Sequence, residues 1–224
     1  MAYRHTEKVK RQLAERHAAI IAAAREIAAE HGMKGVQVAS VAARAGIAAG
    51  TVYRYFPSKA ELVRTLVEAT SEQEILAMRR AADSAPGPLS ALAATAAIFA
   101  ARAASRRRLS WALLAESADS ELEGFRRAYR KALASEFEAR IHAATLAGRL
   151  PEQDARIAAS AIVGGLIEAL VGNSKPPALD DQPGRQEEVR ALVLLVLRGL
   201  GVADAQARGL VVQTALPTAV GDVA

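Results

Sequence analysis

Residues 38–62 read VASVAARAGIAAGTVYRYFPSKAEL, and this stretch decides the fold of the first part of the chain. It predicts two short helices, over about residues 38–45 and 49–56, separated by a turn at Gly46. The first helix offers a small residue, Ala42, where a second helix can cross closely, and glycine four residues later supplies the positive φ of a sharp turn. This geometry is typical of a helix-turn-helix motif, which places its second helix in the major groove of DNA.

The residues around the motif agree with this interpretation. Apolar side chains occupy the inward positions Val41, Ile47, Val52 and Phe56. Pro57 ends the second helix, because the residue before a proline is pushed out of the α region. Ser58 and Glu61 have the spacing of a capping box, which predicts a long helix that begins near Lys59 and reaches the 70s or early 80s.

The remainder of the chain is expected to be helical too, which makes the fold class all-α. Alanine, the best helix former, is the most frequent residue, and strands with strict alternation are absent. Gly32 and Gly201 mark helix ends, and Pro151 is placed to open a helix. The tail 202–224 has weak periodicity and receives no assignment. Helical patterns cover residues 11–31, 88–104, 106–117, 120–147, 152–172 and 185–200, with a polar loop at 173–184.

The positive charge of the chain is concentrated at its beginning. The 224 residues carry a net charge of +5. Residues 1–60 contain ten Lys and Arg against four Glu, whereas residues 61–224 contain 19 basic and 20 acidic side chains. This asymmetry predicts a basic module that binds nucleic acid, joined to a larger and nearly neutral domain.

The composition argues against several other classes of protein. The absence of cysteine excludes disulfides, thiol catalysis and thiolate metal sites. The four histidines lack metal-ligand spacing, and there is no Gly-rich phosphate loop or Gly-x-Ser-x-Gly elbow, so we expect no enzyme activity, catalytic residue, metal or cofactor. The basic N-terminus lacks the apolar segment of a signal peptide, and the longest apolar run, residues 191–197, is too short to span a bilayer. We therefore expect a cytoplasmic protein without a membrane partner.

Residues 16–63 resemble the DNA-binding domain of the TetR (tetracycline repressor-like) family of bacterial transcriptional regulators. The resemblance is carried by Glu30-His31-Gly32, by Ala45-Gly46-Ile47 and most specifically by GTVYRYFPSKAEL at residues 50–62. It implies phosphate contacts from Thr51, Tyr53, Tyr55 and Lys59, close approach of the backbone to DNA at Gly50, and variable base contacts near Gln37, Ala48 and Ala49.

Further DNA contacts are expected from Arg54 and from a flexible basic arm that holds Arg4, Lys8, Lys10 and Arg11. The sequence departs from the family pattern at two positions. Ala48 stands where the family often has Ser, which removes an N-cap worth about 1 kcal/mol. Gln37 stands where it often has Thr, and its amide could reach an adenine or a phosphate.

The resemblance also implies a division into residues 1–58, which bind DNA, residues 59–201, which bind a ligand and dimerise, and the tail 202–224. Homodimerisation is expected through the helices at 152–172 and 185–200. The first of these helices is rich in small residues. The second helix has a broad apolar stripe formed by Val189, Leu192, Val193, Val196, Leu197 and Leu200. An intramolecular core is the competing interpretation of both helices.

For the ligand we can name only aromatic candidates, and such residues more often belong to the core. They are Phe99, Trp111, Phe125 and Tyr129. The arginine clusters 106–108 and 126–130 could receive an anion, although a solvated face is the simpler interpretation. Glu168, inside an apolar helix, could pair with an arginine, face solvent or touch a ligand.

The function expected from these features is that of a ligand-responsive repressor. It would bind a palindromic DNA operator as a homodimer and be released when a small-molecule effector tilts the helix that begins at Lys59. The alternative is an architectural protein that binds DNA without sequence preference.

Overall fold

A computed structural model of the protein describes residues 2–116, 120–172 and 185–214. Every regular element in these ranges is an α-helix, as expected. The predicted loop at 173–184 lies outside the described residues. The helices in chain order are α1 (Ala2–Gly35), α2 (Val38–Arg44), α3 (Ala49–Tyr55), α4 (Lys59–Asp83), α5 (Pro88–Ser105), α6 (Arg107–Leu114), α7 (Ser120–Leu146), α8 (Ala155–Val171), α9 (Arg185–Gly199) and α10 (Asp204–Gln213).

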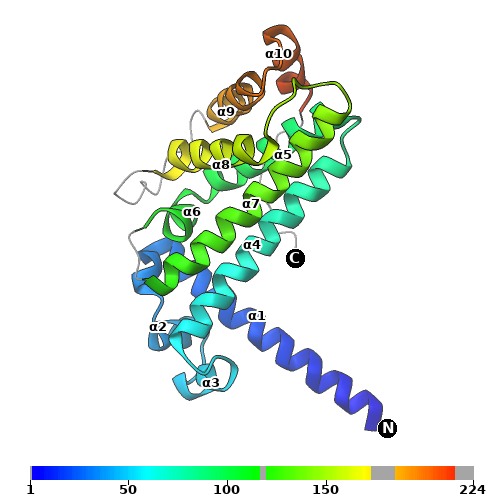
Figure 1. The fold of residues 1–224 in the computed structure, drawn as a ribbon. Coiled ribbons are helices and arrows are strands. Elements are labelled where there is room, and N and C mark those ends of the chain that lie inside the picture. Colours follow the sequence, from blue (N-terminus) through cyan, green and yellow to red (C-terminus); the bar gives the residue numbers. More distant parts are fainter. Residues whose placement is uncertain (1, 117–119, 173–184, 215–224) are drawn as a thin grey trace.

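The N-terminal helix is longer than the sequence pattern predicted. α1 is already helical at Ala2, and its first half projects away from the rest of the molecule (Figure 1). Leu13 is therefore 49% exposed, whereas Ile20 is fully buried. The prediction that the basic arm is flexible is therefore wrong. Its residues are good helix formers and include no helix breaker, so the helix continues toward the N-terminus.

Gly32 interrupts α1, as the sequence predicted. Its backbone has φ 72° and ψ 179°, which lies outside the helical region. The chain then makes one more turn and enters α2 through Gln37. Ile20, Ala24 and Ile27 of α1 pack into the core, whereas His31 is exposed.

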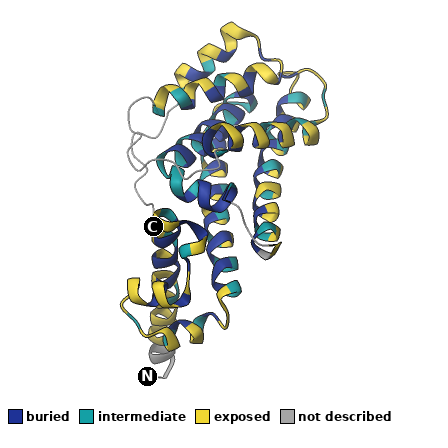
Figure 2. Cartoon of the chain, turned by 90° about the vertical axis from the view of Figure 1, so that its left-hand side faces the viewer, coloured by how far each residue is buried: buried dark blue, intermediate teal, exposed yellow. Residues whose placement is uncertain are grey.

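The larger domain is a bundle whose long helices α4, α5 and α7 lie against one another (Figure 1). Figure 2 shows that burial follows the inner faces of these helices. α5 also contacts α8, α9 and α10, so it is covered on several sides. Among the described helices, α5 alone has the length and composition that could cross a membrane, and 61% of it is buried. The core helix of a bundle meets the same test, and the central place of α5 in the bundle accounts for its composition.

The structure of the helices near the C-terminus differs in detail from the sequence prediction. α8 begins at Ala155, because the Asp154 carboxylate caps it by accepting from Ile157 N (3.0 Å), so Pro151 does not open this helix. Pro151 instead packs beside Gly201, whose φ of 92° ends the α9 segment as predicted. The unassigned tail contains α10, which packs on α9 and α5 through Ala207 and Val211.

The apolar stripe predicted for dimerisation on α9 is buried within the chain. All six residues are 9% exposed or less: Val189, Leu192, Val193, Val196, Leu197 and Leu200. The intramolecular interpretation is therefore correct for this stripe, since α9 packs on α5. The opposite face of α9 still exposes Leu195 (65%), and α8 exposes Gly164 and Gly165. Glu168, which the sequence left undecided, is also exposed on α8.

Candidate DNA-binding surface and effector cavity

The turn between α2 and α3 has the geometry that its sequence predicts. Gly46 has φ 66°, in the left-handed region that glycine tolerates. Gly46 N donates to the Ala43 carbonyl (3.2 Å), and Ile47 N donates to the Ala42 carbonyl (3.0 Å), which closes the end of α2. Ala42 itself is buried, so the two helices cross closely at this small residue.

The buried residues of α3 determine which face of this helix is exposed to solvent. Val52 and Phe56 are almost fully buried, as predicted. The Phe56 ring lies against the His17 ring of α1, with 4.8 Å between the ring centroids. α3 is thereby held against α1, and its other face is turned to solvent.

None of the nine residues predicted to contact DNA is buried. Thr51 and Tyr55 are partly covered, and Tyr53 is 52% exposed. Gln37 donates its amide hydrogen to the Lys34 carbonyl (2.9 Å), so this donor is already used within the chain. The solvent-exposed members of the set are Gln37, Ala48, Ala49, Gly50, Tyr53, Arg54 and Lys59.

The basic side chains of this region differ in their partners. Arg44 on α2 binds Glu26 and Glu30 of α1, at 3.1 Å and 2.6 Å. The hydrogen bonds from Arg44 lower the pKa of Glu30 below its usual value. Arg54 and Lys59, in contrast, make no ion pair with any described residue. Arg44 therefore joins α2 to α1, while Arg54 and Lys59 keep their charge for an external anion.

The start of α3 lacks a side-chain cap. Ala48 is the N-cap residue, with extended backbone angles and no side-chain hydrogen bond to the helix. Thr51 N reaches the Ala48 carbonyl (2.8 Å), so the first turn depends on backbone contacts alone.

Ala48→Ser should therefore stabilise the protein. A serine hydroxyl at an N-cap accepts a hydrogen bond from the second or third backbone N–H of the helix, which is worth about 1 kcal/mol. We expect the free energy of unfolding in urea to rise by about that amount. Ala49→Ser, one residue inside the helix, is the matched control and should give no such gain. Equal effects of the two substitutions would contradict the capping argument.

α4 begins with a cap formed by Ser58. The Ser58 hydroxyl oxygen accepts from Glu61 N at 3.1 Å. The second half of the predicted capping box is replaced by another contact, because the Glu61 carboxylate accepts hydrogen bonds from Arg64. Lys59 is consequently the first residue of a 25-residue helix that continues into the larger domain.

α6 joins the larger domain to α1. Arg108 donates to the carbonyls of Ala29 (2.8 Å) and Glu30 (2.5 Å). Beyond the other end of α6, the buried Glu116 carboxylate accepts from Met33 N at 2.6 Å. A Cβ on Gly32 would lie only 2.7 Å from this carboxylate, so glycine is required here by space as well as by its φ of 72°. These contacts anchor the end of the first helix to the larger domain.

Arg126 of α7 holds the C-terminal end of α6. Its side chain is 2% exposed, and its guanidinium donates to the carbonyls of Ala112 (2.7 Å), Leu113 (2.9 Å) and Glu116. Arg130 donates to the Leu114 carbonyl. The interpretation of residues 126–130 as a solvated face is therefore wrong for Arg126. The end of a short helix supplies carbonyls without helical partners, and the arginine satisfies them.

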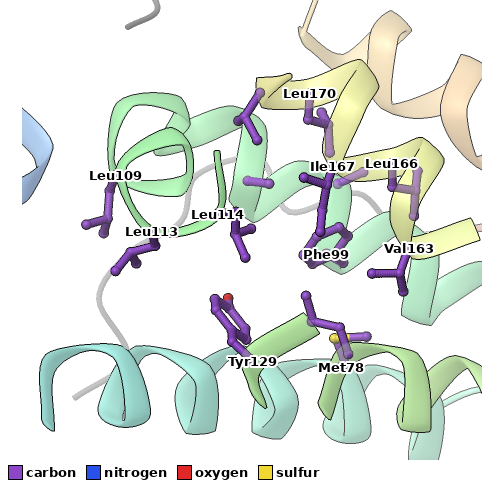
Figure 3. Packing of buried hydrophobic residues seen from close by; sticks show 14 of the residues in the cluster. Met78, Phe99, Leu109, Leu113, Leu114, Tyr129, Val163, Leu166, Ile167 and Leu170 are labelled. Carbon is purple, nitrogen blue, oxygen red and sulfur yellow. The ribbon is translucent and has the colours of Figure 1, made fainter. Parts of the chain in front are cut away.

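A small cavity of about 20 Å³ lies between α4, α5, α6 and α7. Two of the predicted aromatic ligand contacts, Phe99 and Tyr129, line it, and Figure 3 shows both turned toward the same space. Trp111 and Phe125 are not part of its lining, although Trp111 is buried and Phe125 packs against the core. The structure thus brings together two of the four candidates.

The cavity also contains a buried ion pair that the sequence analysis missed. Arg102 Nε donates to both carboxylate oxygens of Glu74, at 2.9 Å and 2.8 Å. Their side chains are 14% and 11% exposed. Thr70, Glu74 and Met78 lie four residues apart on the inward face of α4. This helical spacing is the sequence signal that could have shown that Glu74 is buried.

Comparisons with known proteins agree with the N-terminal geometry. Residues 20–66 match the family model described as "Bacterial regulatory proteins, tetR family". Over these residues the chain is similar to the tetR family. One similar curated protein is the HTH-type transcriptional repressor KstR of Mycolicibacterium smegmatis, which is 49% identical over 49 residues. These residues are 22% of this chain and 24% of that repressor, so the match spans about a quarter of the relative.

Solved structures extend the likeness from this segment to the fold of the chain as a whole. The fatty acid degradation regulator FadR of Bacillus halodurans has a TM-score of 0.72 and 23% identity, covering 84% of this chain and 97% of its own. RolR in complex with resorcinol has a TM-score of 0.64 and 21% identity, covering 93% and 98%. The helical domain that follows the tetR-family segment therefore has the fold found in these regulators.

The matched segment contains every residue of the candidate DNA-binding surface, from Gln37 to Lys59. The curated proteins that match this segment are named HTH-type transcriptional repressors. Within the described ranges, no group of three or more His, Asp or Glu is arranged to hold a metal ion.

Proposed function

We propose that this chain is a tetR-family transcriptional repressor that binds a near-palindromic operator as a homodimer and is released by a small-molecule effector in the cytoplasm. The observation that carries this proposal is the outer face of α3. It presents Tyr53 and Arg54 to solvent, with Lys59 at the start of the next helix and no ion pair on either cation. Such groups donate to DNA phosphates, while the beginning of the helix enters the major groove.

The homodimer is supported by the surfaces left open on the last part of the bundle. The outer side of α8 exposes Ala161, Gly164, Gly165 and Ala169, where the backbone of a second helix can approach closely. α9 adds the exposed Leu195. Two copies related by a twofold axis would place two helix-turn-helix units on the same side of DNA. We propose residues 1–58 as the DNA-binding domain and residues 59–201 as the effector and dimerisation domain, with α10 added to the latter.

The coupling between the two functions is proposed to run through α4 and α6. Lys59 and Glu74 lie on the same helix, about 22 Å apart at 1.5 Å per residue, and Glu74 lines the cavity. α6 lines the cavity through Leu113 and binds α1 through Arg108. An effector that occupies the cavity would shift these helices and change the spacing of the two DNA-binding units.

Selection of bound DNA from a random pool tests this function. We expect the selected sequences to contain two half-sites related by a dyad, with centres about one helical turn, or a multiple of it, apart. A pool that shows no enrichment after repeated selection would favour an architectural protein and overturn the repressor proposal.

A further inference from the structure

Two adjacent arginines at the start of α6 bind different parts of the molecule. Arg107 donates to the carboxylate of Glu188, in the first turn of α9, at 2.5 Å. Arg108 donates to the carbonyls of Ala29 and Glu30 in α1. Both arginines are partly buried, so they do not form the solvated face that the sequence favoured. α6 thus connects the last part of the bundle to the first helix of the chain.

α6 also supplies partners for two backbone groups at the break in α1. In an unbroken helix these groups would pair with each other, because Met33 N would donate to the carbonyl four residues earlier, that of Ala29. In this structure Met33 N donates instead to the buried Glu116 carboxylate, at 2.6 Å. The Ala29 carbonyl accepts from Arg108 at 2.8 Å. The two partners come from opposite ends of α6, so the kinked end of α1 at Gly32 is held at two points.

The DNA-binding domain is therefore attached to the larger domain at two separate places. The first is the chain itself, because α3 leads into α4 through residues 56–58. The second is α6, which packs on α1 and lies between that helix and α8 (Figure 1). A single connection leaves a domain free to turn about it, whereas a second connection at another place fixes its orientation. The contacts of α6 thus determine how the two domains are arranged.

We infer that α6 is a strut that sets the separation of the two DNA-binding domains in the dimer, with Arg107, Arg108 and Glu116 as positioning residues for the spacing of the operator half-sites. This inference rests on the proposed function, since it concerns the homodimer and the operator described there. α9, which Arg107 binds through Glu188, is one of the helices proposed to form the dimer. At the other end of the strut, α1 packs against Phe56, the residue that ends α3.

The spacing of the half-sites matters because the second half-site is bound by a domain that is already tethered. Linked modules gain affinity from simultaneous binding only where their geometry allows it. One additional base pair between the half-sites moves them apart by about 3.4 Å and rotates one relative to the other by about 35°. A dimer with a rigid strut loses affinity for such a site. A dimer with a loosened strut binds both spacings with similar affinity.

Fluorescence anisotropy of the full-length protein with a set of labelled operators tests the inference. The set contains the selected near-palindromic site and versions with one base pair added or removed between the half-sites. We expect the unaltered chain to prefer the selected spacing at least about tenfold. Arg107→Met, Arg108→Met and Glu116→Met should each reduce this preference to about threefold or less. The preference is a ratio of affinities, so a variant that only loses stability, and with it part of the active protein, leaves the ratio unchanged.

Two control variants separate these contacts from general effects. Glu116→Gln keeps a side-chain oxygen that can accept from Met33 N, so it should retain the full preference. Arg149→Met removes an exposed arginine that follows α7 and should retain the preference as well.

The other outcomes contradict the strut. A methionine variant that keeps the full preference would overturn the role of its residue, and full preference in all three would overturn the inference. Loss of the preference in Arg149→Met, or equal binding of all spacings by the unaltered chain, would overturn it too. Failure to select any dyad-related site would instead refute the repressor proposal on which the inference rests.

Discussion

Lys59→Ala should weaken binding to the operator about a hundredfold. Lys59 is exposed at the first residue of α4 and makes no ion pair with a described residue, so its charge is available to a phosphate. A hydrogen bond to a charged group contributes about 1.5 kcal/mol or more, and the dimer would lose two of them. Fluorescence anisotropy with labelled operator DNA measures this change. The slope of log affinity against log salt should also fall by about two.

The control for this experiment is Lys131→Ala. Lys131 is an exposed lysine on α7, in the larger domain, so its loss changes the total charge equally without touching the proposed surface. We expect this variant to bind with nearly unchanged affinity and salt dependence. If Lys59→Ala behaved like Lys131→Ala, the phosphate contact at the start of α4 would be refuted.

Arg126→Met should lower the free energy of unfolding by about 3 kcal/mol or more. The substitution leaves three carbonyls at the end of α6 without the donor that now satisfies them, and each buried unsatisfied group costs about 1–3 kcal/mol. Methionine retains much of the side-chain volume, so the effect reports on the hydrogen bonds rather than on a cavity. Urea denaturation followed by circular dichroism measures it.

Arg127→Met is the neighbouring control on the same helix. Arg127 is exposed, and loss of an exposed arginine is expected to change the free energy of unfolding by no more than about 0.5 kcal/mol. A similar loss in both variants would show that the carbonyl contacts of Arg126 contribute nothing specific. A smaller loss for Arg127 supports the view that α6 is held in place by α7.

The helix-turn-helix could be predicted from the sequence because its determinants are local. Ala42 and Gly46 act through backbone angles and contacts within the motif itself, and the structure places them as their spacing indicates. The exposure of the proposed DNA contacts on α3 follows from the same local motif, since a short helix buried on one side must expose the other.

The interior of the larger domain could not be predicted in the same way. Glu116 contacts Met33 across 83 residues of sequence, and Arg102 reaches Glu74 from a different helix. Their roles depend on how helices pack, which no local pattern contains. The sequence favoured a solvated face for the arginines at 126–130. Arg126 is buried instead, because it donates hydrogen bonds to the carbonyls at the end of α6. The stripe on α9 was real, yet its partner is α5 rather than a second copy.

The most direct test of sequence-specific DNA binding is the ratio of two affinities measured at one salt concentration. The full-length protein is titrated with the near-palindromic site obtained by selection and with a scrambled duplex of the same length and composition. We expect the selected site to bind at least about a thousandfold more tightly, as specific regulators do. Equal affinity for the two duplexes would contradict the assignment of α3 as a recognition helix.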